Sequence, residues 1–413
     1  MAEGPLEEVD VAVIGAGPAG LSAAIELRER GVSRVVVLER ESEAGGVPRH
    51  CGHPPFGWFE YGRVLSGPTY AARLRADARD LDIQLRTTVA ALGAGGRLDL
   101  ATPEGPKALL ARRVILATGA RETPRSARLV GGARPVGVTT TGALQAMVYL
   151  KNRAPFERPL IVGTELVSFS AILTCRKAGI RPVAIVEETA RVVAPWPCIF
   201  YPRLLGIPVH MSTRVVAIEG GARVEAALLR DGQGHESRVA CDGVLFTGRF
   251  VPEASLLRAS HLAVDPATGG PVVDQTGRCS DPAYFAAGNV LRPIETAGWS
   301  FREGRTMGAT VAEDLARAPG VRGHAVSISP RPPVRLVMPQ KLTLPTNGTG
   351  LSALQLRVER PVTGDLRIVS GGVPIWRRHV RTGPERRLLV PLNGFLERIR
   401  SDTLTVEFEE RTA

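Results

Sequence analysis

Short apolar runs alternate with amphipathic stretches over the first three quarters of the chain. Residues 9–15 form a buried-strand pattern that ends at a glycine, residues 18–30 show helical periodicity, and residues 34–39 form a second apolar run. This order predicts a βαβ unit with parallel strands. The same kind of pattern then predicts a helix at 70–80 and strands at 83–89, 97–101 and 112–119.

A second βαβ pattern begins 148 residues after the first, with Gly163 in the place of Gly15. It predicts a strand at 159–163, a helix that ends near residue 178, and a strand at 183–186. Later apolar runs predict strands at 207–218, 223–230, 243–248 and 283–288, and a helix at 297–315. The two units form a weak internal repeat.

The pattern changes after residues 319–320. Apolar and polar residues alternate with period two in short runs at 354–358, 366–369, 375–378, 388–390 and 404–408. Alternation of this kind, with turns between the runs, predicts a small antiparallel β-sandwich. We therefore expect a separate C-terminal β module.

The clearest motif is Gly15-Ala-Gly-Pro-Ala-Gly20, between the first strand and the first helix. In such a loop the glycines allow a tight turn, a close approach of pyrophosphate to the backbone, and close packing of helix against strand. Glu39 ends the second strand, where a carboxylate can accept hydrogen bonds from ribose hydroxyls. The motif predicts a dinucleotide site, with FAD or NAD favoured over NADP.

Several further motifs occur in a fixed order along the chain. They are Glu39-Arg40 followed by Gly45-Gly46, then residues 114–124 with their Ala-Thr-Gly core, and then residues 244–249 and 284–289. In this order the chain resembles the flavoproteins of the glutathione reductase type, which carry two dinucleotide-binding domains. The resemblance covers about residues 8–318 and implies FAD at the N-terminal site.

The resemblance also implies which residues hold FAD. Gly15, Gly17 and Gly20 flank the pyrophosphate, Glu39 binds the ribose, and the backbone of Val89 meets the adenine. The other residues implied are Pro18, Ala19, Arg40, Gly46, Val47, Thr118, Gly119, Gly288, Asn289, Thr296 and Ala297. The last two begin a helix that points at the flavin pyrimidine, where negative charge builds up on reduction. Asn289 stands where the family has an aspartate.

We therefore expect an α/β fold. An FAD-binding Rossmann-like domain of residues 1–125 and 242–320 carries an inserted, degenerate NAD(P)-binding-like domain of residues 126–241. A C-terminal antiparallel β-sandwich of residues 325–413 follows.

The second dinucleotide motif is degenerate, since Glu165 stands where a nicotinamide site requires glycine. A negative side chain there opposes pyrophosphate both sterically and electrostatically. Glu187 ends the next strand and can still hold a ribose. We therefore expect a structural remnant, and we leave open a second adenine nucleotide at Gly163 and Glu187.

The cysteine pair of the disulfide reductases is missing. Cys51 stands alone between His50 and His53, either as a buried loop cysteine or as a thiolate near the flavin. His50, Cys51, His53 and Glu295 lie on segments that the family places near the flavin ring, and they are weak catalytic candidates. The five cysteines are scattered and predict no metal site.

The formal net charge is +11, and only four of the 52 basic residues are lysine. Residues 322–413 hold 15 Arg and Lys against 8 Asp and Glu. Aromatic residues make up 5% of the chain and do not alternate with basic ones, so we expect no nucleic-acid binding. We expect the basic C-terminal surface to meet an acidic partner subunit.

Within the family, the segments at 45–53, 66–70, 122–124 and 295–299 look most like the FAD oxidoreductase subunits of dye-linked dehydrogenases. These accompany glycerol-3-phosphate, opine, hydroxyproline and hydrogen-cyanide-synthase-type enzymes. The resemblance implies a hetero-oligomer with a second flavoprotein and a small iron–sulfur protein. A free-standing NAD(P)H-dependent reductase using Cys51 and a non-catalytic nucleotide-binding scaffold are the alternatives.

No apolar run approaches the ~18 residues of a membrane span, and the acidic N-terminus lacks the features of a signal peptide. We expect a cytoplasmic protein, with peripheral membrane association through partners left open.

Overall fold

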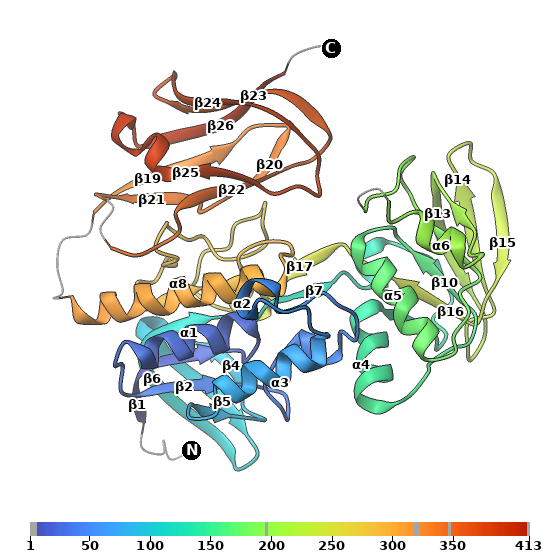
Figure 1. Ribbon diagram of the computed structural model, residues 1–413, viewed down its shortest axis with the longest axis horizontal. Helices are drawn as coiled ribbons and strands as arrows, with labels where there is room; N and C mark the ends of the chain where they lie inside the picture. Colours follow the sequence, from blue (N-terminus) through green and yellow to red (C-terminus); the bar gives the residue numbers. More distant parts are fainter. Residues whose placement is uncertain (1–5, 195–196, 318–322, 346–347, 411–413) are drawn as a thin grey trace. The chain divides into compact units, whose positions relative to one another are not determined.

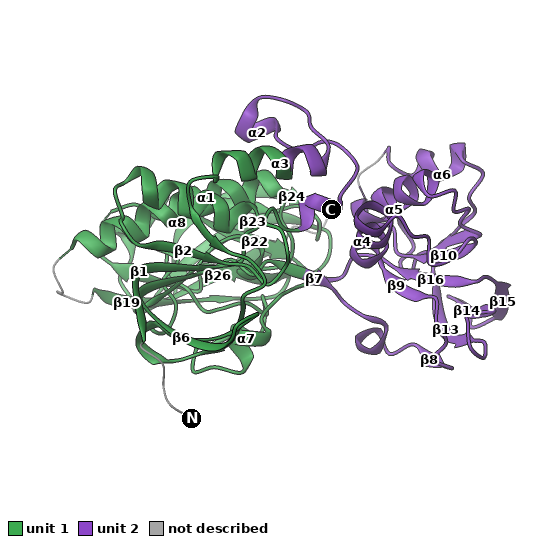
Figure 2. Cartoon of the chain, turned by 90° about the horizontal axis from the view of Figure 1, so that it is seen from below, with its two compact units in different colours: residues 1–46, 71–120, 251–413 green, residues 47–70, 121–250 purple. Residues whose placement is uncertain are grey.

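The computed structural model describes residues 6–194, 197–317, 323–345 and 348–410. These form two compact units (Figure 2): unit 1 draws on residues 1–46, 71–120 and 251–413, and unit 2 on residues 47–70 and 121–250. The change in pattern at residues 319–320, and the chain ends at 1–5 and 411–413, lie outside the described residues. The three-domain division of the sequence analysis stays a prediction.

Unit 1 is built on a seven-stranded sheet in the order β3-β2-β1-β6-β5-β4, with β18 also paired to β6 (Figure 1). Its elements are β1 (Glu7–Ile14), α1 (Pro18–Glu29), β2 (Val35–Leu38), α3 (Gly67–Asp77, whose first turn belongs to unit 2), β3 (Asp82–Gln84), β4 (Thr88–Leu92), β5 (Arg97–Thr102), β6 (Gly105–Leu116), α7 (Ser255–Arg258), β18 (Tyr284–Ala286) and α8 (Ala297–Ala316). This confirms the predicted α/β class with a Rossmann-like sheet.

The strands β1, β2, β6 and β18 run parallel, so their carboxyl ends meet at one edge of the sheet. Four motifs of the sequence follow these strands directly: Gly15 after β1, Glu39 after β2, Thr118 after β6 and Gly288 after β18. Ligands of open parallel sheets bind beyond the carboxyl ends of the strands. The topology therefore gathers the predicted cofactor residues of unit 1.

Helices α1 and α8 lie side by side on this sheet (Figure 1) and pack closely through glycine. A Cβ atom at Gly304 would lie 2.1 Å from Ala19 O, and one at Gly308 would lie 2.5 Å from Ala23 O. Both contacts advance by four residues in each helix, so the two helices run parallel. Their N-termini therefore point toward the same edge of the sheet.

Unit 2 contains a five-stranded parallel sheet in the order β12-β11-β10-β16-β9 and a four-stranded sheet in the order β15-β14-β13-β8. Its elements include α2 (Trp58–Tyr61), β8 (Gly131–Gly132), β9 (Val138–Thr140), α4 (Thr141–Lys151), β10 (Pro159–Val162), α5 (Leu166–Lys177), β11 (Ala184–Val186), α6 (Phe200–Leu204), β12 (Val209–His210), β13 (Thr213–Glu219), β14 (Ala226–Asp231), β15 (Glu236–Ala240) and β16 (Gly243–Phe246). The predicted βαβ unit is formed by β10, α5 and β11.

The internal repeat is visible in the backbone hydrogen bonds. Gly15 N donates to Leu38 O at 2.9 Å, and 148 residues later Gly163 N donates to Val186 O at 2.8 Å. Both glycines have positive φ, +104° and +115°. The two βαβ units thus share one turn geometry.

The residues after β18 and α8 build a β-sandwich within unit 1, drawn in orange and red in Figure 1. One sheet has the order β21-β19-β26-β23-β24 and the other β20-β22-β25. The strands are β19 (His324–Pro330), β20 (Val334–Met338), β21 (Lys341–Leu344), β22 (Ala353–Val358), β23 (Val362–Ser370), β24 (Val373–Thr382), β25 (Leu388–Pro391) and β26 (Thr403–Glu410). Pairing is antiparallel except between β19 and β26, which run parallel, a detail that alternation alone does not reveal.

Among the described residues, no helix is both long and apolar enough to cross a membrane.

The packing of α8 on α1 is open to a direct test. Gly304→Leu should lower the stability of unit 1 by about 1–3 kcal/mol, because the new side chain must displace Ala19 and Ser22. Urea unfolding followed by tryptophan fluorescence measures the change. Gly221→Ala is the control, since a Cβ there meets nothing within 4 Å. Equal midpoints for Gly304→Leu and the wild type would contradict this packing.

Candidate functional site

The loop between β1 and α1 requires glycine at its first and last motif positions. Gly15 has φ +104°, and a Cβ there would lie 2.6 Å from Ala117 O. At Gly20 a Cβ would lie 1.8 Å from Gly15 O. Side chains at these positions would push helix α1 away from the strands. The two glycines therefore shape the loop itself.

Gly17 is different, because the space around it is open. It is the N-cap of α1, and a Cβ there would meet only the Gly46 Cα atom, at 3.9 Å. Pro18 follows at the start of the helix, and the first turn holds no acidic residue. An open backbone beside a helix N-terminus is suited to an anion such as pyrophosphate.

The second glycine loop packs against the first. Gly45 N donates to Ala16 O at 2.8 Å, and Gly46 adopts φ +62°. A Cβ at Gly46 would lie 2.7 Å from the Gly17 Cα atom. Only glycine therefore lets the two loops approach each other. Arg40, between Glu39 and this loop, is exposed.

Glu39 is held at the end of β2 by backbone donors. Ala16 N donates to Oε2 at 2.8 Å and Glu41 N donates to Oε1 at 2.9 Å, and the side chain is buried. Each carboxylate oxygen keeps a second acceptor position, which can receive a ribose hydroxyl. Thr87 N donates to Glu39 O, so the backbone that leads into Val89 begins beside this carboxylate.

The strands β6 and β18 supply the other side of the candidate site. Thr118 Oγ1 donates to Glu253 O at 2.8 Å, and Gly119 has φ +77° with open space at its Cβ position. Gly288 packs on α1, since a Cβ there would lie 2.7 Å from Ala19 Cβ. Gly17 and Gly119 both leave open space at their Cβ positions, and both follow strands whose carboxyl ends meet at the edge of the sheet where such folds bind ligands.

Asn289 secures the loop that precedes α8. Its Oδ1 accepts from Glu295 N at 2.8 Å, and its Nδ2 donates to Glu295 O at 3.1 Å. An aspartate could accept the first bond but could not donate the second. Thr296 is the N-cap of α8 and accepts from Trp299 N, and Ala297 is the first helical residue. The departure from the family aspartate thus has a local structural use.

Glu295, one of the weak catalytic candidates, is paired with two arginines. Its Oε1 accepts from Arg357 Nη2 at 2.6 Å, and its Oε2 lies 3.3 Å from Arg387 Nη1. Neither arginine carries a signal in the sequence, because both look like ordinary polar positions of the β module. With both oxygens paired to guanidinium groups, we infer a holding role for Glu295 rather than proton transfer.

The other catalytic candidates, His50, Cys51 and His53, belong to unit 2 together with Val47. Cys51 is buried and its Sγ lies 3.4 Å from Gln145 Oε1, to which it donates. Burial, assisted by the charge of Glu122, raises the pKa of the Cys51 thiol to about 12. The thiol is therefore protonated at neutral pH and is a poor nucleophile in this state. No cluster of metal-binding side chains occurs in the described part of the chain.

In unit 2, Glu165 fills the place that corresponds to the open backbone of unit 1. A Cβ at Gly163 would lie 2.8 Å from Glu165 Oε2, and one at Gly248 would lie 2.2 Å from Glu165 Cδ. Arg249 N donates to Oε1 at 3.3 Å. Burial raises the pKa of this carboxyl, while the charge of Arg128 opposes the shift. The side chain stands as a fixed acid where a pyrophosphate would lie.

Glu187 nevertheless repeats the arrangement of Glu39. Thr164 Oγ1 donates to its Oε2 at 2.5 Å, and Thr189 N donates to its Oε1 at 2.9 Å. Unlike Glu39, Glu187 also accepts a hydrogen bond from Thr189 Oγ1, at 2.8 Å. A second adenine nucleotide at Gly163 and Glu187 stays a proposal.

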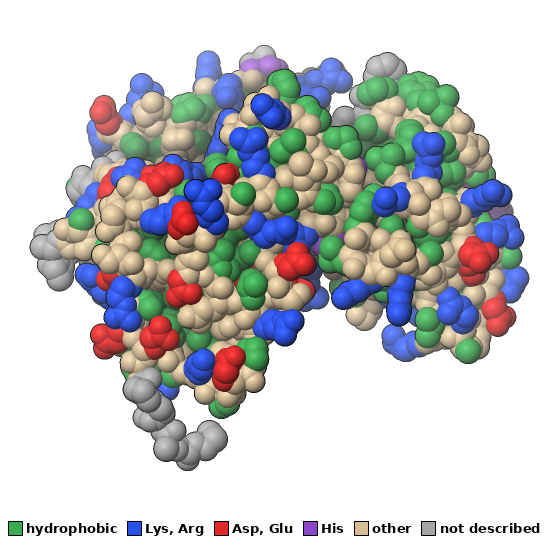
Figure 3. Space-filling view, turned by 60° about the horizontal axis from the view of Figure 1, so that its bottom comes forward, with side chains coloured by type: hydrophobic (Ala, Val, Ile, Leu, Met, Phe, Trp, Pro, Cys, Tyr) green, Lys and Arg blue, Asp and Glu red, His purple; other side chains and the backbone are tan. Residues whose placement is uncertain are grey.

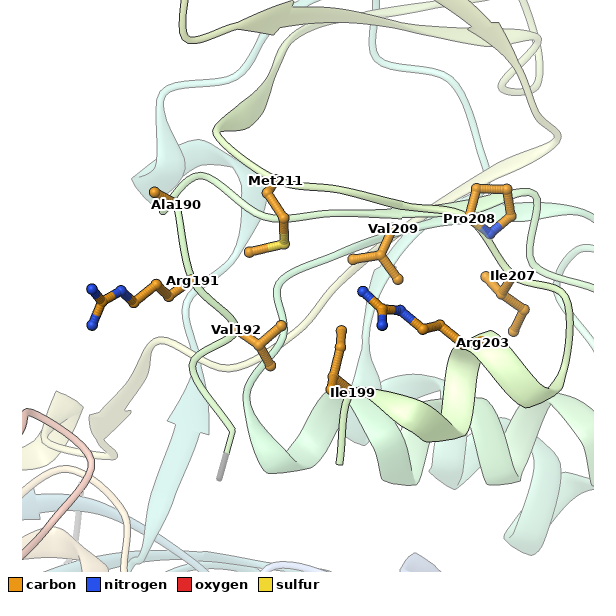
Figure 4. Close-up of a pocket in the computed structure, with 9 residues that line it drawn as sticks. All are labelled: Ala190, Arg191, Val192, Ile199, Arg203, Ile207, Pro208, Val209 and Met211. Carbon is orange, nitrogen blue, oxygen red and sulfur yellow. The ribbon is translucent and has the colours of Figure 1, made fainter. Parts of the chain in front are cut away.

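A pocket of about 270 Å³ lies elsewhere in unit 2 (Figure 4). Its walls are mostly apolar, Arg203 reaches across it, and Arg191 points away from it (Figure 4). The lining residues are Ala190, Arg191, Val192, Ile199, Arg203, Ile207, Pro208, Val209 and Met211. None of the predicted site residues lines this pocket.

Two dinucleotide-binding βαβ units, one open and one obstructed, define a flavoprotein of the two-domain reductase type. A family model described as pyridine nucleotide-disulphide oxidoreductase matches residues 9–314. The chain belongs to this family, it is an FAD-binding oxidoreductase, and the predicted resemblance and cofactor are confirmed. When bound, FAD supplies reversible uptake of two electrons, and the residues above are those we propose to hold it.

Two curated relatives and one solved structure illustrate the similarity. The chain is 27% identical over 425 residues to the ferredoxin–NAD(+) reductase component of the biphenyl dioxygenase system of Paraburkholderia xenovorans (strain LB400), covering 97% of this chain and 92% of that protein. It is 30% identical over 183 residues to an opine oxidase subunit of Rhizobium meliloti (strain 1021), covering 44% of this chain and 39% of that protein. The second match thus spans less than half of that relative.

The crystal structure of T. acidophilum thioredoxin reductase superimposes with a TM-score of 0.64 and 23% sequence identity, covering 75% of this chain and 100% of that chain. This likeness supports the fold.

Substitution of Gly17 separates cofactor binding from folding. A Cβ at Gly17 meets no protein atom closer than 3.9 Å, so Gly17→Ala and Gly17→Val should fold normally. We expect both to bind FAD at least ~10-fold more weakly, with valine the worse, because the side chain projects into the pyrophosphate space. Flavin absorbance after reconstitution measures binding, and circular dichroism checks the fold. Wild-type FAD affinity in Gly17→Val would show that pyrophosphate does not lie there.

Proposed function

We propose that this protein is the FAD-binding subunit of a multi-subunit dehydrogenase. In this role it passes electrons from an amine, opine, imino-acid or glycerol-3-phosphate-like substrate to an acceptor. The substrate loses a hydride equivalent and a proton, and the two electrons leave through the FAD to a second flavoprotein or a small iron–sulfur protein.

The observation that carries this proposal is the side chain of Glu165. Its carboxylate lies within 2.8 Å of where a Gly163 Cβ would be, at the start of α5. A carboxyl group held at a helix N-terminus occupies space near the backbone that a phosphate would approach, and in its charged form it repels a phosphate. A subunit that takes electrons from a non-nicotinamide substrate has no need of that site.

The similarity to an opine oxidase subunit supports a role in a hetero-oligomer, since that relative is named as one part of a larger enzyme. The basic C-terminal module offers a surface for such a partner. Three of its acidic residues are paired within the module: Glu407 and Glu409 pair with Arg367, and Glu410 pairs with Arg360. None of these pairs uses an arginine of β24.

Strand β24 is an edge strand of the five-stranded sheet, and its Arg377, Arg378 and Arg381 are exposed. By contrast, the face of unit 1 visible in Figure 3 shows basic side chains interspersed with acidic ones. Charge complementarity favours an acidic partner surface at this edge. The same arginines disfavour pairing of this edge with the edge of another copy of the chain, because like charges would meet.

A second candidate is a free-standing NAD(P)H-dependent reductase. The similarity to a ferredoxin–NAD(+) reductase component, which extends over 97% of this chain, favours it. Two observations count against a free-standing reductase: the side chain of Glu165 beside Gly163 and Gly248, and the raised pKa of the Cys51 thiol.

Anaerobic reduction of the bound flavin distinguishes the two candidates. We expect NADH and NADPH to leave the flavin of the purified chain oxidised for minutes, because Glu165 occupies the phosphate position. Glycerol 3-phosphate, opines and imino acids should reduce it once the partner subunits are present. Glu165→Gly should accelerate reduction by NADH at least ~10-fold, the effect of relieving one repulsive phosphate contact.

The matched control is Cys51→Ser, which should change none of these rates. Reduction of the wild-type chain by NADPH alone within seconds would refute the subunit proposal and favour the second candidate.

The partner surface is tested by charge reversal. Arg377→Glu, Arg378→Glu and Arg381→Glu together should abolish co-purification with the co-expressed partner subunits, because they invert the charge of the β24 edge. The control reverses three exposed arginines of unit 2, Arg153, Arg181 and Arg214, and should assemble normally. Normal assembly of the β24 variant would exclude this edge as the docking site.

A further inference from the structure

The loop between β18 and α8 is clamped by arginines from the C-terminal β module. Arg357 on β22 donates from Nη2 to Glu295 Oε1 at 2.6 Å and to Ile294 O at 3.1 Å. From Nη1 it donates to Glu385 O at 2.9 Å. One guanidinium group thus joins the loop before α8 to the turn before β25.

Arg387 adds a second link to the same loop. Its Nη1 lies 3.3 Å from Glu295 Oε2, and its guanidinium carbon lies 3.8 Å from the centre of the Trp299 ring. Trp299 is in the first turn of α8. The side chains of Glu295, Arg387 and Arg357 are 8%, 11% and 15% exposed. This clamp is therefore largely shielded from water.

A second buried pair continues the cluster along α8. Arg292 pairs with Glu303 and donates from Nη1 to Gly288 O at 2.9 Å. Gln355, two residues before Arg357 on β22, donates from Nε2 to Glu303 Oε1 at 2.9 Å. The β module therefore contacts both the loop before α8 and the helix itself.

The cluster carries an excess of positive charge. Three guanidinium groups, of Arg292, Arg357 and Arg387, face two carboxylates, of Glu295 and Glu303. Burial weakens the screening of these charges by solvent, so they act over longer distances than an exposed pair. The excess lies at the N-terminal half of α8, where the helix dipole is also positive.

We propose that Arg357 and Arg387 are positioning residues for the flavin: they fix the loop before α8 and, through the excess positive charge, raise the midpoint potential of the bound FAD. In this proposal, two arginines of the β module contribute directly to the binding and the midpoint potential of the flavin. This inference rests on the proposed placement of the flavin at the N-terminus of α8.

Substitutions of opposite charge separate this role from a merely structural one. Arg387→Gln removes a positive charge and should shift the midpoint potential of the flavin to more negative values. Glu295→Gln removes a negative charge from the same clamp and should shift it to more positive values. General loosening of the loop would move both potentials in one direction or leave both unchanged.

The affinity for FAD supplies a second readout. Arg357→Gln and Arg387→Gln should each raise the dissociation constant about tenfold or more, because each leaves Glu295 with an unpaired oxygen in a buried setting. Arg387→Lys should retain most of the affinity for FAD, since a single amino group can pair with the Glu295 carboxylate. Arg357→Lys should not, because Arg357 bridges four acceptors.

The experiment uses the full chain, reconstituted with FAD and titrated anaerobically with redox dyes of known potential. Arg360→Gln is the matched control, because it breaks an exposed Arg–Glu pair of the same module and should change neither affinity nor potential. Hydrogen exchange of residues 288–296 in the apo-protein reports on the clamp without any flavin. It should increase in Arg357→Gln and Arg387→Gln and not in Arg360→Gln.

The three measurements test the clamp, its coupling to the flavin and the proposed function separately. Unchanged exchange of residues 288–296 would overturn the clamp. Increased exchange with unchanged affinity and potential would overturn its coupling to the flavin. A wild-type chain that does not bind FAD would overturn the proposed function, and the exchange data would still judge the clamp. Should Arg357→Gln not fold, Arg387→Gln and Glu295→Gln test the same prediction.

Discussion

The close approach of α1 and α8 is the constraint on which the candidate site depends. Gly304 and Gly308 let α8 lie directly on the backbone of α1 at Ala19 and Ala23. Because the helices run parallel, both N-termini reach the carboxyl edge of the parallel strands. Ser22 Oγ, which donates to Phe301 O at 2.8 Å, keeps this arrangement in register. A side chain at either glycine would separate the helix dipoles from the glycine loops that they complement.

The two βαβ units share a turn geometry but differ in the residues of the glycine motif. Gly15 and Gly163 share the turn, and Glu39 and Glu187 each accept the backbone N–H of the residue two positions later. The loops differ at the later motif positions, where Gly17 and Gly20 correspond to Glu165 and Ser168. At Gly17 the backbone is open, whereas the side chain of Glu165 folds back onto Gly163 and Gly248. This contact is the observation behind our proposal that the second motif is closed to a nucleotide.

Local patterns in the sequence predicted the elements with strong periodicity. The helix expected at 18–30 is α1 (Pro18–Glu29), and the helix expected at 297–315 is α8 (Ala297–Ala316). Strand β6 was predicted only over 112–119, because the two arginines at 112 and 113 interrupt the apolar pattern between Ala108-Leu-Leu-Ala111 and the run that follows. Helix α4 (Thr141–Lys151) was not predicted, since its buried positions, such as Leu144 and Val148, are few and mixed with polar ones.

Contacts between distant segments could not be predicted from such patterns. Arg357 lies 62 residues from Glu295 and looks like any outward-facing residue of an alternating strand. Its partner is set by the packing of the β module on α8, which no local signal encodes. The same holds for Cys51, whose burial against Gln145 depends on a contact across 94 residues. Motifs identified the cofactor, whereas only the tertiary structure shows which distant side chains contact one another.

The central claim is that the chain holds one dinucleotide, FAD, and that Glu165 keeps the second site closed. Quantifying the nucleotides released from the purified, acid-denatured protein, followed by equilibrium dialysis against NADH and NADPH, tests it most directly. The account predicts one FAD per chain and no bound nicotinamide nucleotide at concentrations up to the millimolar range. Stoichiometric binding of NADH or NADPH to the FAD-loaded chain, or the absence of FAD, would contradict it.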